Sequence, residues 1–125
     1  MLDLENFPVL NEHIILKEAL DKMDKFHLGI ACITDNHGKL LGIITDGDIR
    51  RKLSAVQKPL SSFFVDDSIS HAIKNPVVID ENSNVLEALD LMEKNQIWDL
   101  PVVNQNRLVG LIHMHSIANL LKNKV

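Results

Sequence analysis

The chain has 125 residues, of which 46% are hydrophobic and 24% charged, a composition typical of a compact protein with a buried core. Its net charge of -4 argues against a nucleic-acid-binding protein, which would need clustered lysine and arginine. The N-terminus lacks the basic start and apolar stretch of a signal peptide, and no apolar run approaches the roughly 20 residues of a membrane-spanning helix. We therefore expect a cytoplasmic protein with neither a nucleic-acid nor a membrane partner.

The first elements in chain order are a short strand and a helix. Residues 8–10 are apolar and led by a proline, which favours a strand. Leu16, Ala19, Leu20 and Met23 then recur at the spacing of one helix face, so this helix covers one side of a core.

Two strands and a closing helix follow. Residues 29–34 and 40–45 are apolar and rich in β-branched side chains, and the turn formers of residues 35–38 connect them as a hairpin. Cys32 lies inside the first of these strands, where a buried, unreactive thiol is expected. Residues 48–53 form the second helix. Residues 55–74 form a connector whose apolar side chains predict that it packs against the body.

The second half repeats the first. Val85, Ala88, Leu89 and Met92 carry the same helix stripe, and each lies 69 positions after its counterpart. The other predicted elements are strands over residues 76–79, 100–104 and 108–113 and a helix over residues 116–122. One such unit is marginal alone, so the halves should pack sheet against sheet. The sequence thus predicts an α+β fold of two β-α-β-β-α repeats packed as a pseudo-twofold tandem, divided into residues 1–58 and 59–125.

One segment has the character of a binding site. Residues 42–51 run from a strand end into a helix start, where free N–H groups and the helix dipole favour anions. Gly47 allows close approach of the backbone, Thr45 offers a hydroxyl, and Asp46 and Asp48 offer carboxylates. Arg50 and Arg51 can pair with a phosphate. The alternative is that Thr45 or Asp46 only caps the helix while the arginines are solvated.

The spacing of Gly42, Thr45 and Asp48 resembles the Gly-x-x-Thr-x-x-Asp motif of cystathionine-β-synthase-type (CBS) repeats. The resemblance covers both halves of the chain. It implies a regulatory module that binds adenosine nucleotides or related ligands in clefts between the repeats, with no catalytic residue, no bound metal and no cofactor. The ligand-binding residues that it implies are Pro8, Val9, Ile30, Thr45, Asp46, Gly47, Asp48, Arg50, Arg51, Val77, Leu100, Pro101, His113, Met114 and His115.

A narrower resemblance comes from residues 45–51 and from His113-Met114-His115, which are similar to the CBS pair of arabinose-5-phosphate isomerases of the KpsF/GutQ/KdsD type. It implies a sugar-isomerase (SIS) domain upstream in the parent chain, and a role in synthesis of 3-deoxy-manno-octulosonate (Kdo) for lipopolysaccharide or capsule. Where that family usually has Asp after His-Met-His, this chain has Ser116, and His113 takes the place of Thr45. We therefore expect two unequal clefts, with the first the better nucleotide site.

Several alternatives remain open at this stage. The ligand could be the pathway product CMP-Kdo, or AMP or ATP, and the parent could carry a sugar nucleotidyltransferase instead of an isomerase. His113 and His115 would face the same side of a strand, but without a third ligand nearby a metal is disfavoured. Trp98 either stacks on a base or anchors the packing. The apolar faces of the closing helices, with Ile49 and Leu53 in one and Ile117, Leu120 and Leu121 in the other, predict a homodimer.

Overall fold

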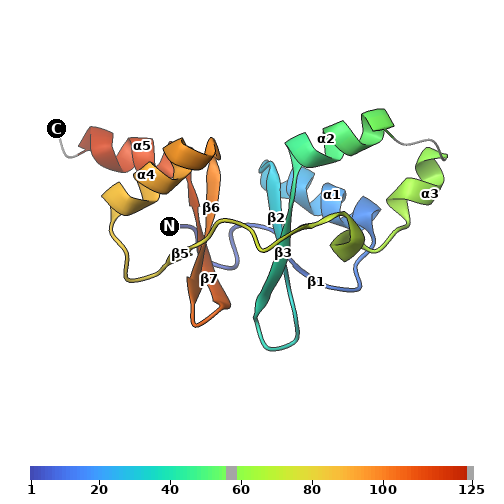
Figure 1. Cartoon of the computed structure of the whole chain (residues 1–125), viewed down its shortest axis with the longest axis horizontal. Helices are drawn as coiled ribbons and strands as arrows, with labels where there is room; N and C mark the ends of the chain where they lie inside the picture. The colour runs from blue at the N-terminus through green and yellow to red at the C-terminus, as the bar shows by residue number, and fades with distance from the viewer. Residues whose placement is uncertain (56–58, 124–125) are drawn as a thin grey trace.

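Two lobes of similar build lie side by side in the computed structural model, which describes residues 1–55 and 59–123 and the side chains of α5 as far as Ala118 (Figure 1). The first lobe contains β1 (Val9–Asn11), α1 (Leu16–Phe26), β2 (Ile30–Thr34), β3 (Leu40–Thr45) and α2 (Asp46–Ala55). The connector contains α3 (Leu60–Phe64), a 3-10 turn η1 (Ser68–His71) and β4 (Ile73–Lys74). The second lobe contains β5 (Ile79–Asp80), α4 (Val85–Asn95), β6 (Asp99–Asn104), β7 (Arg107–His113) and α5 (Met114–Asn123).

Each lobe is built on its own small sheet. The first has the strand order β1-β2-β3-β4 and the second β5-β6-β7, with the first pair parallel and the others antiparallel. The helices lie on the outer sides of the lobes, while the hairpins β2–β3 and β6–β7 face each other in the middle (Figure 1). The α+β fold of two β-α-β-β-α repeats is therefore confirmed.

Local irregularities repeat along with the elements, which shows that the halves share one backbone plan. The hairpin of each lobe shifts register at the same place, between Ile33 and Thr34 in the first and between Val102 and Val103 in the second. Both long helices end on a left-handed residue, His27 with φ 54° and Gln96 with φ 53°. A left-handed residue is a common helix terminator, and its repetition at equivalent positions is best explained by duplication.

The lobes share a hydrophobic seam, defined here by Phe7, Ile30, Cys32 and Ile43 from the first repeat and Leu108 and Leu111 from the second. All six side chains are buried. Burial raises the pKa of the Cys32 thiol to about 12, with a smaller contribution from the charge of Asp99. The thiol stays protonated and unreactive at neutral pH, as its place in an apolar strand predicts.

A reciprocal pair of backbone hydrogen bonds closes the far end of the seam. The Leu40 N–H donates to the Asn106 carbonyl at 3.0 Å, and the Leu108 N–H donates to the Gly38 carbonyl at 2.9 Å. Because these four residues exchange places between the repeats, the two bonds lie about the pseudo-twofold axis. The hairpin turns thereby fix the register of one lobe against the other.

The connector packs on the first lobe, as the sequence predicts, but it forms elements that were not expected. Phe63 of α3 is buried in the core of the first repeat, against residues such as Leu16 and Ile49. Its strand β4 adds an edge to the first sheet by pairing with β3. The division expected between residues 58 and 59 lies beside residues 56–58, outside the described residues.

Three elements begin two or more residues away from their predicted starts, while the other strands differ by one residue at most. The helix expected at residue 48 begins at Asp46, because the Thr45 hydroxyl caps it by accepting a hydrogen bond from the Asp48 N–H at 3.3 Å. The helix expected at residue 116 begins at Met114, directly after β7. The strand expected over residues 76–79 is reduced to Ile79–Asp80.

The closing helices do not leave the expected apolar faces free. Ile49 and Ile117 are each buried in the core of their own lobe, and Leu53 packs against the first core. These three side chains therefore give no support for a homodimer, which stays a prediction, and the side chains of Leu120 and Leu121 lie outside the described part. None of the described helices has both the length and the apolar character needed to cross a membrane.

We expect Phe63→Ala to lower the free energy of unfolding by about 3–5 kcal/mol, because it removes a fully buried aromatic side chain from the first core. Urea denaturation measures the change. Leu60→Ala, on the exposed side of the same short helix, is the matched control and should change it by less than about 0.5 kcal/mol. Equal effects of the two substitutions would show that the connector does not belong to the core.

Candidate functional site

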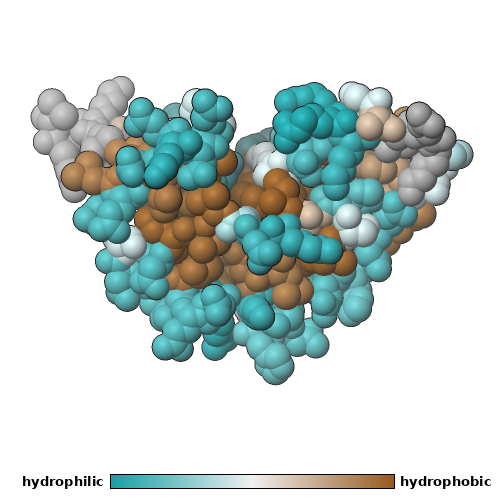
Figure 2. Space-filling view, viewed as in Figure 1, coloured by the Kyte–Doolittle hydropathy of each residue, from teal (hydrophilic) through white to brown (hydrophobic). Residues whose placement is uncertain are grey.

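A cavity of about 720 Å³ opens between the two lobes. Its walls come from the start of α2 on one side and from the end of α4 and the loop after it on the other, and Figure 2 shows a notch between the lobes at this place. The volume lies inside the range of about 300–1,000 Å³ usual for small-molecule sites. The lining residues are Gly29, Ile30, Ile43, Thr45, Asp46, Gly47, Arg50, Arg51, Ile73, Val77, Asn95, Gln96, Ile97, Trp98, Asp99 and His113.

The first repeat contributes the first turn of α2, which carries both polar oxygens and cations. Thr45, at the end of β3, caps the helix, and Asp46 and Gly47 follow at once. A Cβ atom on Gly47 would lie 3.4 Å from Arg51 Nη1 and 3.8 Å from Arg50 Nη2, so both guanidinium groups lie over this glycine. The amide dipoles at a helix start and two guanidinium groups together favour an anion.

Gly29 makes room for Asp46 at the cavity wall. The Asp46 N–H donates to the Gly29 carbonyl at 3.0 Å, and a Cβ atom on Gly29 would lie only 3.0 Å from Asp46 Oδ2. A larger side chain at position 29 would therefore push this carboxylate away. The second repeat keeps the backbone bond, from the Met114 N–H to the Trp98 carbonyl at 2.8 Å, but Trp98 and Met114 replace the glycine and the aspartate.

The second repeat contributes a partly buried acid, Asp99, and a histidine, His113. His113 Nδ1 lies 2.7 Å from Asp99 Oδ1, across the β6–β7 hairpin. Burial raises the pKa of Asp99, the hydrogen bond and charge of His113 lower it, and the charge of Asp46 raises it again. Burial is the largest of these effects, so the pKa of Asp99 lies above its usual value. The cavity therefore holds a mixed group of cations, carboxylates and an imidazole.

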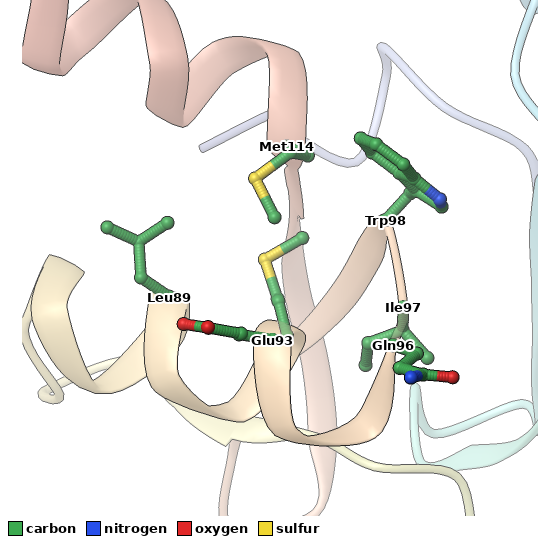
Figure 3. Close-up of a pocket in the computed structure, with 7 residues that line it drawn as sticks. Leu89, Glu93, Gln96, Ile97, Trp98 and Met114 are labelled. Carbon is green, nitrogen blue, oxygen red and sulfur yellow. The ribbon is translucent and has the colours of Figure 1, made fainter.

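Trp98 stands at the junction of this cavity with a smaller apolar crevice. Its side chain is 70% exposed, which rules out the interpretation that it anchors the packing. In Figure 3, Leu89 and Glu93 of α4 and Met114 of α5 border the crevice, with Trp98 beside them. An exposed aromatic ring at the edge of a polar cavity is suited to stacking on a planar ligand.

The structure brings eight of the fifteen residues expected from the sequence to the cavity wall. They are Ile30, Thr45, Asp46, Gly47, Arg50, Arg51, Val77 and His113. Thr45 and its counterpart His113 line one and the same cavity, although two separate clefts were expected.

The other seven do not line the cavity, for physical reasons. Pro8, Leu100 and Pro101 are fully buried and do not line the cavity, and Val9 packs on the seam. Met114 faces the apolar crevice instead. The remaining two are Asp48 and His115.

Asp48 and His115 lie in the first turns of α2 and α5. The Asp48 carboxylate is 19% exposed and lies 3.8 Å from both Arg51 Nη2 and Lys52 Nζ. His115 is exposed on α5, with its ring centre 6.5 Å from that of His113. The two histidines do not share a strand face, and no cluster of three or more potential metal ligands occurs among the described residues.

Sequence reasoning missed several lining residues, of which Asp99 matters most chemically. Asp99 lies 69 positions after Ile30, a residue that was expected to line the site. Following the repeat from Ile30 to Asp99 would have found it, together with its partner His113. Ile43, Ile73 and the loop of residues 95–97 carry no chemical signal of their own and were not expected.

The family is defined by comparison with known proteins. The model for the CBS domain matches residues 3–55 and 65–123, so the chain belongs to the CBS domain family. It is therefore a CBS domain pair, a class of regulatory ligand-binding module without catalysis of its own, as the sequence motifs predict.

Three relatives give this assignment more detail. The chain is 32% identical over 115 residues to arabinose 5-phosphate isomerase KdsD of Francisella tularensis, covering 90% of the chain and 33% of the isomerase. It is 20% identical to CBSX2 in a crystal structure with AMP, with a TM-score of 0.85 and coverage of 100% of this chain and 95% of CBSX2. It is 26% identical to the CBS domain pair of protein MJ0100 in complex with methylthioadenosine and S-adenosylmethionine, with a TM-score of 0.78 and coverage of 99% and 94%. The chain spans about a third of the length of the curated relatives it matches.

We expect His113→Ala to raise the pKa of Asp99 further. The hydrogen bond and charge of His113 favour the ionised carboxylate, so their removal leaves the effect of burial unopposed at this site. Carbon-detected NMR titration of the carboxyl groups measures the pKa. His115→Ala, which removes an exposed imidazole nearby, should leave it unchanged. If the pKa of Asp99 is the same in His113→Ala as in the wild type, the pairing of Asp99 with His113 is contradicted.

Proposed function

We propose that the chain is the nucleotide-sensing regulatory module of a longer protein. The observation that carries this proposal is that one cavity joins the cationic start of α2 in the first repeat to Trp98 in the second. A phosphate suits the α2 side, where Arg50 and Arg51 lie over Gly47. A base suits the exposed face of Trp98.

The sugar of the ligand would lie between these two ends. Thr45 and Asp46 offer a hydroxyl and a carboxylate there, and both line the cavity. Asp48, which the family motif suggests for this role, lies 3.8 Å from Arg51 and so acts by orienting that arginine. A ligand held in this way contacts both repeats, so its binding free energy depends on how the lobes are placed.

The parent protein that we propose is a sugar-phosphate isomerase that interconverts ribulose 5-phosphate and arabinose 5-phosphate. Similarity to arabinose 5-phosphate isomerase KdsD over 90% of the chain supports it. The ligand would then be CMP-Kdo, whose cytidine, phosphate and acidic sugar meet the stacking and cationic features of the cavity, and binding would report the level of the pathway's product. Homodimerisation of the module and a cytoplasmic location remain part of this proposal.

A second ligand class is favoured by a specific relative. The CBS pair of MJ0100 is described in complex with methylthioadenosine and S-adenosylmethionine, so an adenosine ligand such as AMP or ATP is the alternative occupant. The two classes differ in the base and the charged group. Titration with both therefore separates them.

We expect the wild-type chain to bind CMP-Kdo or an adenosine nucleotide, and the double variant Arg50→Ala/Arg51→Ala to bind it at least about tenfold more weakly, because charge-assisted hydrogen bonds to the phosphate are lost. Isothermal titration calorimetry gives the affinity. Quenching of the single tryptophan, Trp98, reports whether the base reaches the predicted end of the cavity.

The matched control is Arg107→Ala, which removes an exposed arginine at the hairpin turn of the second repeat, away from the cavity lining. It should bind as the wild type does. If none of the nucleotides binds to the wild-type chain, the sensor proposal is wrong. If one binds with an affinity that the double variant retains, the phosphate is not held at α2.

A further inference from the structure

The second lobe carries a pocket of about 240 Å³ on the side away from the nucleotide cavity. Apolar side chains from five elements line it, among them Ile79, Ala88, Val102 and Ile117. The volume is below the range of about 300–1,000 Å³ usual for small-molecule ligands, so a side chain is a better fit than a metabolite. Hydrophobic surface extends over this lobe in Figure 2.

The duplication shows what belongs in such a pocket. The residues of the first repeat that correspond to its base are Leu10, Ala19, Ile33 and Ile49, and all of them belong to one core cluster with Phe63. Phe63 comes from α3 of the connector. The first repeat thus fills with a connector phenylalanine the place that no described residue fills in the second.

One pair of equivalent residues makes the difference plain. Leu16, the first residue of α1, is 0% exposed beneath the connector, and its N–H donates to the Asp66 carbonyl at 2.9 Å. Val85, the first residue of α4, lines the pocket and is 36% exposed. Its neighbour Leu86 is 71% exposed. The start of α4 therefore exposes apolar surface that its counterpart buries.

The pairing of the strands also indicates from which direction a segment would reach this pocket. The connector reaches the first sheet through Ile73, which pairs with Ile43 of β3. Leu2 pairs in the same way with Leu111, the counterpart of Ile43 in β7. A Cβ atom on Gly42 would lie 2.9 Å from the Ile73 carbonyl oxygen, and one on Gly110 would lie 2.9 Å from the Leu2 carbonyl oxygen. Leu2 is therefore the structural equivalent of Ile73.

We propose that the segment preceding Met1 in the longer protein docks an apolar, aromatic-bearing short helix into this pocket, as α3 docks on the first repeat. Phe63 stands ten residues before Ile73, so the same spacing places the anchoring side chain nine positions before Met1. Met1 itself lines the pocket, which puts the preceding residues at its edge. This inference rests on the proposed function in one respect, that the chain is a module of a longer protein.

The docked segment would give a regulated domain a fixed attachment to the sensor. Ile112 lines the pocket, and the next residue, His113, lines the nucleotide cavity on the other side of the same strand. Ser116 and Ile117 of α5, two and three residues after Met114 begins that helix, border the pocket. A change at the cavity thus has a short path to the segment that leads to the upstream domain.

Limited proteolysis of the full-length protein tests the docking, with Val85→Asp as the variant and Leu86→Asp as its matched control. Both place a carboxylate in the first turn of α4, where the helix dipole favours it, so both variants should fold. Only Val85 lines the pocket. We expect cleavage in the segment before Met1 to accelerate about tenfold in Val85→Asp and to stay near the wild-type rate in Leu86→Asp.

Several results would overturn the proposal. Equal cleavage rates in both variants, or a gene in which nothing precedes Met1, would do so. If Val85→Asp lowers the melting temperature of the 125-residue chain by itself, the pocket is filled by a segment within this chain. If that loss of melting temperature varies with protein concentration, the pocket is filled by a second copy of the chain. Nucleotide affinity measured on the same two variants tests the sensor function separately, because neither residue lines that cavity.

Discussion

The contact of the two sheets along the hydrophobic seam is the constraint on which the rest of the structure depends. A single repeat of about 60 residues is marginal in stability, since too small a share of its surface can be buried. Phe7, Ile30 and Ile43 therefore bury their side chains against Leu108 and Leu111 of the other repeat. The hairpin turns fix the register at one end, and the cavity between the lobes lies where loops and helix starts take the place of packed strands.

Because the chain is a duplication, the two walls of this cavity have the same backbone arrangement but carry different side chains. The first repeat has Gly29 and Asp46 where the second has Trp98 and Met114, and the backbone hydrogen bond between the paired positions is kept in both. Likewise Asp99 takes the place of Ile30. One wall thus presents cations and oxygen atoms, and the other presents an aromatic ring together with the paired imidazole of His113 and carboxylate of Asp99. A single ligand with a charged end and a planar end matches such a cavity better than two identical ligands would.

Much of the fold could be predicted because it follows from periodicity and repetition. The helix stripe of Leu16 to Met23 and its copy 69 residues later fixed both long helices, and the strands could be placed around them. The starts of the closing helices were predicted two residues late, because capping by Thr45 depends on side-chain geometry that a sequence pattern does not contain. The packing of Phe63 on the first core also depends on three-dimensional proximity.

Part of the cavity lining could be predicted from the sequence. The residues carried by the motif at α2, such as Thr45 and Arg50, line the cavity. Pro8, Leu100 and Pro101 were expected there from the resemblance, but their side chains are buried and do not line the cavity. A motif predicts which residues have the right chemistry, but burial is decided by which face of each strand meets the core.

The central claim is that one ligand spans both repeats across the seam, and an amide NMR titration of the chain with CMP-Kdo and with AMP tests it most directly. The account predicts that the ligand that binds shifts the amide signals of Thr45 to Gly47 and of Gln96 to Asp99 together, with one dissociation constant, while those of the hairpin turns at Gly38 and Asn106 stay in place. Shifts confined to one repeat, or spread evenly over the chain, would contradict it.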